Sequence, residues 1–254
     1  MNLLVDFLCR FGWGLAAALV ITPATLVPAG FFRVNLLVVL GIATFAALLG
    51  VQAMPPTTWV LPAAAAAAAW LGSIAWFAER ISGGRMFCAA TAILLATATA
   101  VVHTAGAAPE PGGRGAAAAL LSGLVTGLTV HGMLLGHWYL NAPGMRVDVL
   151  RRLIDATLAV WAAQFALVAG STVAAWAAAA PVTAQAGGAA AAGTTTLALV
   201  SLRWLAGLVG LPVLLWMARE TLAIPNTQSA TGILYVACLA AILGELTAQL
   251  LAAT

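Results

Sequence analysis

The chain has 254 residues, of which 63% are hydrophobic and only 7% are charged, and its mean hydropathy is +1.07. A soluble domain carries about a quarter charged residues, so this chain has too few polar side chains to cover a water-facing surface. The composition therefore excludes a soluble enzyme and predicts an all-α integral membrane protein whose outer face meets the lipid bilayer. The net charge of +3 comes from ten scattered arginines without a basic run, which excludes a nucleic-acid partner.

Eight stretches are long and apolar enough to cross a bilayer core of about 30 Å, which needs roughly 20 residues per helix. We predict transmembrane helices over residues 4–27, 34–53, 58–78, 86–106, 116–140, 149–178, 196–219 and 230–252. Pro23 and Pro28 are expected to kink or end the first helix. The longest connection, 181–196, reads PVTAQAGGAAAAGTTT and carries no charge and no recognisable chemistry.

Arginine placement predicts the orientation of the helices, because basic residues are retained on the cytoplasmic side. Arg10 and Arg114 are assigned to one membrane face, whereas seven of the ten arginines fall at the alternate turns. These seven are Arg33, Arg80, Arg85, Arg146, Arg151, Arg152 and Arg219. Both termini are therefore predicted to be periplasmic. The lack of lysine and the abundance of Ala and Gly are typical of a GC-rich genome, so we expect the inner (cytoplasmic) membrane of a bacterium.

An internal similarity predicts that the chain consists of two related halves. Residues 76–94, WFAERISGGRMFCAATAIL, align without gaps with residues 216–234, WMARETLAIPNTQSATGIL, and six positions coincide. A second match pairs RVNLL at 33–37 with RVDVL at 146–150. We predict two four-helix halves, 1–110 and 111–254, related by an axis along the membrane normal. The alternative is a chance resemblance between turns that join Ala- and Leu-rich helices.

Ionisable residues inside the hydrocarbon are costly, so they are the strongest candidates for function. Arg203 lies about 22 residues before the turn at Pro225 and Glu245 about 20 residues after it, which places both at nearly the same depth on adjacent antiparallel helices. We therefore predict an intramembrane ion pair between Arg203 and Glu245. In the alternative, Arg203 extends outward to the interface and Glu245 faces water separately.

His131 and Asp155 are predicted to lie at a second common depth, each about 12 residues from the turn near Pro143. A histidine beside a carboxylate suits a proton relay or a hydrogen-bonded quinone headgroup. The competing interpretation pairs Asp155 with Arg151 or Arg152 on its own helix. His131 lies too deep for its short side chain to reach water, so we expect it to face the interior of the bundle.

His137 and Tyr139 extend this candidate ligand or proton-relay site towards the membrane boundary, where the alternative is an interfacial aromatic belt. The rings of His131 and His137 project roughly 120° apart and cannot share a metal ion, so no metal site is predicted. A haem b held by two histidines is disfavoured, because His103 lies near the opposite membrane face and more than two turns away from His131. One histidine with another ligand is left open.

No residue motif assigns the chain to a family, and the motifs of ATP hydrolysis, metalloproteolysis and serine hydrolysis are lacking. The two-by-four-helix plan is similar to that of the quinol-binding membrane anchors of bacterial oxidoreductases, a resemblance of plan alone. The leading hypothesis is a non-catalytic membrane subunit of a bacterial electron-transfer complex, with a quinone or, as second choice, haem b, and with partner redox subunits. The alternatives are a secondary transporter of a small solute, which the repeat, Arg203 and Glu245 favour, and a structural or assembly subunit.

Overall fold

The computed structural model describes residues 2–53, 55–106, 114–142, 145–183, 194–224 and 226–253, and within these ranges the chain forms helices and no strands. The helices are α1 (Asn2–Ile21), α2 (Ala29–Ala53), α3 (Pro56–Phe77), α4 (Ile81–Gly106), α5 (Arg114–Asn141), α6 (Asp148–Thr183), α7 (Thr194–Leu202), the π-helix η2 (Arg203–Gly210), α8 (Leu211–Thr221) and α9 (Thr227–Ala253). The segments α7, η2 and α8 follow one another without a break and together form one spanning helix. The described ranges thus hold eight helices long and apolar enough to cross a membrane, which confirms the predicted fold class.

The chemistry of the turns explains where the helices begin and end. α1 ends before Pro23, as expected, but α2 begins at Ala29 and not at residue 34. Pro28 suits the start of a helix, because its fixed φ is already helical and its carbonyl accepts the N–H of Phe31 at 3.0 Å. α6 has 36 residues and is about 54 Å long, so it exceeds the bilayer core, and its spanning part is Asp148–Gly170.

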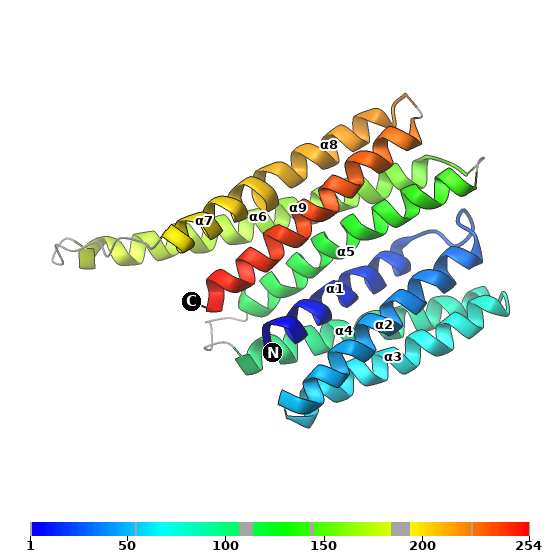
Figure 1. Cartoon of the computed structure of the whole chain (residues 1–254), viewed down its shortest axis with the longest axis horizontal. Helices are drawn as coiled ribbons and strands as arrows, with labels where there is room; N and C mark the ends of the chain where they lie inside the picture. The colour runs from blue at the N-terminus through cyan, green and yellow to red at the C-terminus, as the bar shows by residue number, and fades with distance from the viewer. Residues whose placement is uncertain are drawn as a thin grey trace.

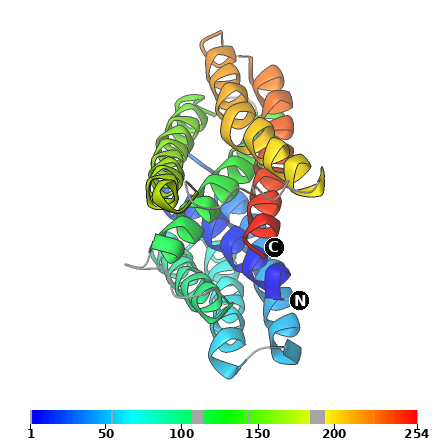
Figure 2. The same ribbon diagram turned by 90° about the vertical axis from the view of Figure 1, so that its left-hand side faces the viewer.

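The eight spans form two rings of four that meet along α1 and α5. In the first quartet, α1 packs against α2 and α4, and α3 contacts α2 and α4. In the second quartet, α5 packs against α6 and α9, and α8 contacts α6 and α9. Figure 1 shows α1 and α5 side by side through the middle of the molecule, and the end view in Figure 2 separates the two quartets.

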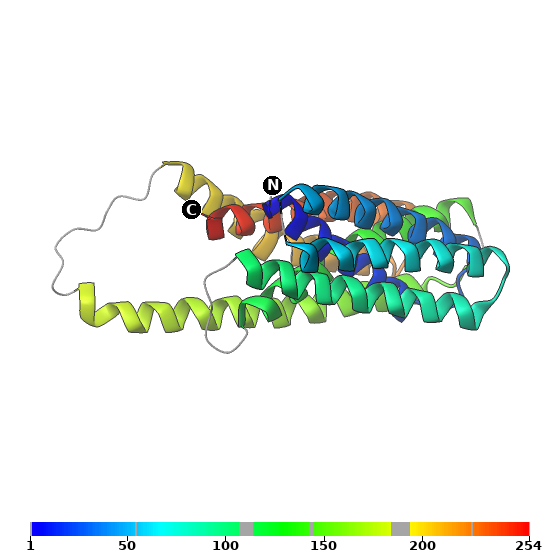
Figure 3. The ribbon, with the colours of Figure 1, turned by 90° about the horizontal axis from the view of Figure 1, so that it is seen from below.

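Both chain ends lie at the same end of the bundle, on the left in Figure 1, and α6 extends beyond the other helices on that side (Figure 3). The opposite end holds the turns of the seven arginines, and we call it the arginine-rich end. Which membrane face each end meets stays a prediction.

In both quartets the first and third spans each contact the second and fourth. The duplication of residues 1–110 as residues 111–254 stays a prediction. The aligned tryptophans have different surroundings. Trp76 stacks on Phe32 with ring centroids 4.3 Å apart and is only 2% exposed, whereas Trp216 is 59% exposed. The third and seventh spans therefore differ in how they pack within their quartets.

Glycines allow α1 and α5 to touch through their backbones. A Cβ atom added at Gly14 would overlap the carbonyl group of Gly123, and one added at Gly127 would overlap the backbone of Gly14. A Cβ at Gly123 would lie 2.5 Å from the carbonyl oxygen of Arg10. Gly123 and Gly127 are four residues apart, the spacing with which small residues let two membrane helices approach closely. The junction of the quartets therefore depends on these three glycines.

Gly127→Ala is expected to destabilise the protein, because the new methyl group would meet backbone that has no room to move aside. The expected loss is about 1–3 kcal/mol, seen as a lower melting temperature in detergent. Gly232→Ala is the matched control, since nothing lies within 4 Å of a Cβ at that position. Equal melting temperatures of the two variants would contradict the backbone contact.

Single introduced cysteines test the orientation. Ile224→Cys, at a position 79% exposed at the arginine-rich end, is expected to react with a membrane-impermeant maleimide only from the cytoplasm. Gln52→Cys, exposed at the opposite end, is expected to react only from the periplasm. The reverse pattern in right-side-out and inside-out vesicles would show that both termini are cytoplasmic.

Candidate functional site

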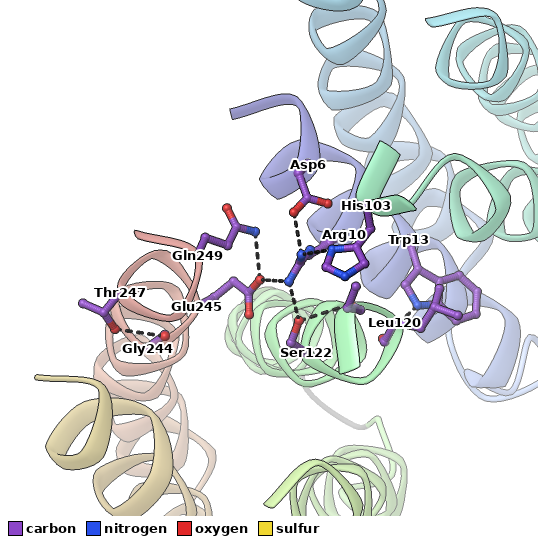
Figure 4. A network of polar contacts seen from close by, with 11 residues as sticks. Asp6, Arg10, Trp13, His103, Leu120, Ser122, Gly244, Glu245, Thr247 and Gln249 are labelled. Atoms are coloured by element: carbon purple, nitrogen blue, oxygen red, sulfur yellow. Dashed lines mark hydrogen bonds and ion pairs between the residues drawn. The ribbon is translucent and has the colours of Figure 1, made fainter. Parts of the chain in front are cut away.

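The most polar place inside the bundle lies around Arg10 (Figure 4). Arg10 and Asp6 are four residues apart and therefore share one face of α1. The Arg10 guanidinium contacts Asp6 Oδ2 through Nη2 at 2.5 Å and Glu245 Oε1 through Nη1 at 2.9 Å. One cation thus bridges a carboxylate of its own helix and a carboxylate of α9.

Three further side chains complete this ionic network. Arg10 Nη1 donates to Ser122 Oγ of α5 at 3.4 Å, and Gln249 Nε2 donates to Glu245 Oε1 at 2.9 Å. Arg10 Nη2 lies 3.1 Å from His103 Nδ1 of α4. Because a guanidinium can only donate, Nδ1 accepts and the imidazole proton resides on Nε2. The network, Asp6, Arg10, His103, Ser122, Glu245 and Gln249, therefore joins α1 and α4 of the first quartet to α5 and α9 of the second.

Burial makes the ionic network energetically important. Asp6 and Arg10 are each 9% exposed, and Glu245 and Gln249 are each 5% exposed. Inside a low-dielectric bundle, a charge that loses its partner carries the full cost of desolvation. Asp6 Oδ1 and Arg10 Nε are already buried without a hydrogen-bond partner. The network is therefore nearly, but not fully, satisfied.

A small polar cavity adjoins the network within the second quartet. Its volume is about 30 Å³, and Glu245 and Arg203 both line it, together with Ser122, Thr126 and Gln164. Glu245 thus lies between Arg10 of the first quartet and the cavity of the second.

Close backbone contact also shapes the cavity wall. A Cβ atom at Gly244 would lie 2.6 Å from Gly207 Cα, so α9 and η2 meet through two glycines next to Glu245 and Arg203. The π-helical turns continue to Gly210, where a Cβ would lie 2.5 Å from the carbonyl oxygen of Leu205. π-helical segments occur frequently at functional sites. Glycine at 210 is therefore part of what permits this backbone.

The structure gives Glu245 a different partner from the predicted one. Its ion pair is with Arg10, and no ion pair joins it to Arg203, although both residues lie within the described ranges. Sequence reasoning had assigned Arg10 to a membrane face. The available signal was depth, since Arg10 and Glu245 lie about eight residues, or about 12 Å, inside the same end of the bundle.

His131 is completely buried, as expected, but it does not meet Asp155. His131 Nε2 lies 2.9 Å from Thr22 Oγ1, and its ring packs edge-on against Phe31. The partner of Asp155 is Arg219 of α8, whose Nε lies 2.5 Å from Asp155 Oδ1. His131 and Asp155 lie at a similar depth, but their side chains do not face each other across the two helices. The predicted His131–Asp155 contact is therefore replaced by the His131–Thr22 and Asp155–Arg219 contacts.

His137 and Tyr139 do not join His131 either. His137 is exposed, with its Nδ1 3.4 Å from Tyr235 Oη, whereas Tyr139 is buried and donates to the carbonyl of Arg146. The four candidate residues of the proposed relay therefore lie in separate surroundings, and the cavity beside Glu245 contains none of them.

A larger, open hollow of about 680 Å³ lies at the arginine-rich end. The turn between α1 and α2 forms one side, and Trp76, Glu79 and Arg146 contribute side chains. Glu79 has a φ of 54°, and Arg146 is held by Asp148 at 2.7 Å. Among the described residues Glu79 thus has no ion-pair partner, whereas Arg146 is already paired.

Comparison of the chain with protein-family models, with curated proteins and with solved structures finds no match. The interpretation of the site therefore depends on its own chemistry.

A double-mutant cycle tests the Arg10–Glu245 pair. Arg10→Gln is expected to cost about 3–5 kcal/mol, because it leaves the buried carboxylates of Asp6 and Glu245 without their cation, and Glu245→Gln is expected to cost less, because Arg10 keeps Asp6. The double variant is expected to lose less than the sum of the two losses. The control cycle uses Arg146→Gln and Asp148→Asn, whose side chains are 66% and 55% exposed and whose pair is expected to contribute below about 1 kcal/mol. Strictly additive losses at Arg10 and Glu245, measured by unfolding in detergent, would refute the pair.

Proposed function

We propose that the protein is a secondary transporter of a small solute, with its central site at Arg10, Glu245 and the adjoining cavity. The observation that carries this proposal is the position of a buried ionic network at the junction of the two helix quartets, next to a polar cavity within the second quartet. Ionisable residues inside transmembrane segments mark solute and ion pathways. Transporter sites typically lie where two halves of the molecule meet, since relative movement of the halves exposes the site to either side.

Glu245 is well positioned to couple binding to movement. Its carboxylate holds Arg10 of the first quartet and also lines the cavity of the second. A proton or a solute that competes for this carboxylate weakens the link between α1 and α9. Arg10 then keeps Asp6 as its partner on its own helix, so the guanidinium is not left alone in the bundle.

The seventh span supplies an element that is able to rearrange. Its eight π-helical residues, Arg203–Gly210, place Arg203 and Gly207 on the cavity wall. Conversion of a π-helical turn to an α-helical turn rotates the residues before it relative to those after it. Such a change would move Arg203 relative to Glu245 without unfolding the span.

The competing hypotheses explain less of this arrangement. A quinone or proton-relay subunit of an electron-transfer complex, working with partner subunits, calls for a shared site of His131, His137, Tyr139 and Asp155, which have separate neighbours. A purely structural subunit accounts for the ionic network but leaves the cavity and Arg203 without a role. The inner membrane of a bacterium remains the proposed location.

Cysteine labelling of the cavity wall tests the proposal without knowledge of the solute. In a background where the buried Cys9, Cys88 and Cys238 are replaced by alanine, Ala248→Cys or Leu211→Cys places one thiol on the cavity. At pH 8, an impermeant methanethiosulfonate reagent is expected to reach the thiol from the end that holds the termini. In the Glu245→Gln variant at the same pH, reactivity is expected to shift towards the arginine-rich end.

The control for this labelling is Ile224→Cys, whose reactivity is expected to stay on one side throughout, because the residue is exposed outside the cavity. Cavity thiols that react from one and the same side under every condition would show a fixed network and would contradict transport.

A further inference from the structure

Three polar side chains from three helices converge on the cavity, and each is without a hydrogen-bond partner in the part of the chain that the structure describes. They are Thr126 of α5, Gln164 of α6 and Arg203 of η2. Thr126 is only 2% exposed. Gln164 and Arg203 are partly exposed. A buried hydroxyl without a partner is costly, so Thr126 calls for an occupant that accepts a hydrogen bond, and Gln164 and Arg203 can donate to the same occupant.

Thr126 differs from other threonines of these helices in a way that supports an occupant. Thr22, Thr99 and Thr129 each donate to the carbonyl four residues earlier in the same helix. Thr126 makes no such bond, so its hydroxyl is free to donate into the cavity. Gln164 can offer two further N–H donors and Arg203 up to five.

The charges around the cavity determine what kind of occupant fits. The charged groups near it are Asp6 and Arg10 of α1, Glu245 of α9 and Arg203 of η2, which sum to zero, and His103 of α4 is neutral while it accepts from Arg10. The Glu245 oxygen that accepts from Arg10 also accepts from Gln249. The positive charge left to a ligand is therefore that of Arg203.

We infer that the cavity is the binding site of a small monovalent anion, held by Arg203, Thr126 and Gln164, and that the anion is transported together with one proton. This inference rests on the transporter function proposed above. The volume of about 30 Å³ has room for about two water molecules, which suits a halide or a small oxyanion.

Charge balance supplies the proton. A monovalent anion brings the sum of the buried charges from zero to minus one, and an unbalanced charge in a low-dielectric site is expensive. One proton restores neutrality, and Glu245 is the carboxylate that lines the cavity. A protonated Glu245 also loses its ionic hold on Arg10, so binding of the anion and release of α1 from α9 occur in the same step.

The experiment uses the full chain in lipid vesicles that contain a pH-sensitive dye, with inward gradients of sodium nitrate or sodium chloride and sodium gluconate as the large-anion reference. The lumen is expected to acidify with nitrate or chloride at a rate that does not change when potassium and valinomycin clamp the membrane potential. Arg203→Gln is expected to lower this rate about tenfold or more, and Thr126→Val several-fold. Arg152→Gln removes an exposed arginine of the opposite end and is the matched control.

Binding is measured separately as the rise in melting temperature in nitrate over gluconate at constant ionic strength, which is expected for the parent chain and lost in Arg203→Gln. Absence of both acidification and stabilisation, in protein whose cavity thiols do change sides, would overturn the anion site and leave the transporter standing. Acidification that persists in Arg203→Gln, or that follows the membrane potential, would overturn it as well. Cavity thiols that never change sides would overturn the transporter itself.

Discussion

The fold depends on one buried cation that holds two carboxylates from distant parts of the chain. Arg10 and Glu245 are separated by nearly the whole sequence, yet they bond at 2.9 Å in a bundle where neither is more than 9% exposed. In hydrocarbon, Glu245 without Arg10 would be an unpaired charge that costs several kcal/mol, whereas Arg10 without Glu245 would keep Asp6. This constraint fixes how far the first and last spans can separate, and it makes any event that neutralises Glu245 an event that loosens the junction of the quartets.

Small residues allow that interaction to form. Gly14, Gly123 and Gly127 bring α1 and α5 into backbone contact, and the carbonyl of Arg10 lies where a side chain at 123 would otherwise be. On the other side of Glu245, Gly207 and Gly244 bring η2 against α9. The charges are therefore surrounded by helix contacts in which backbones meet closely at glycines, which carry no side chains to interlock. Such contacts are compatible both with tight packing and with sliding of one helix past another.

The sequence was sufficient for the helices, because length and hydropathy determine which stretches must lie in lipid, and it also identified Glu245 and Arg203 as intramembrane charges. It did not give their partners. Depth along a helix follows from counting residues, but which face of which helix is turned towards a neighbour depends on packing. Asp155 meets Arg219 and His131 meets Thr22 for that reason. The role of Arg10 was not predicted, because an arginine near a helix end has the same sequence pattern as an arginine at the membrane interface.

The most direct measurement is solid-state NMR of the protein in lipid bilayers, with nitrogen-15 in the arginine guanidinium groups and carbon-13 in the glutamate carboxyl groups. We expect a dipolar coupling that reports the Arg10–Glu245 contact, persists in Glu220→Gln, which removes the Arg219–Glu220 pair, and disappears in Glu245→Gln. We also expect this coupling to weaken when nitrate is added at low pH. A spectrum in which the only coupling is lost with Glu220→Gln would contradict the Arg10–Glu245 contact, because Arg10 would then not hold the two quartets together.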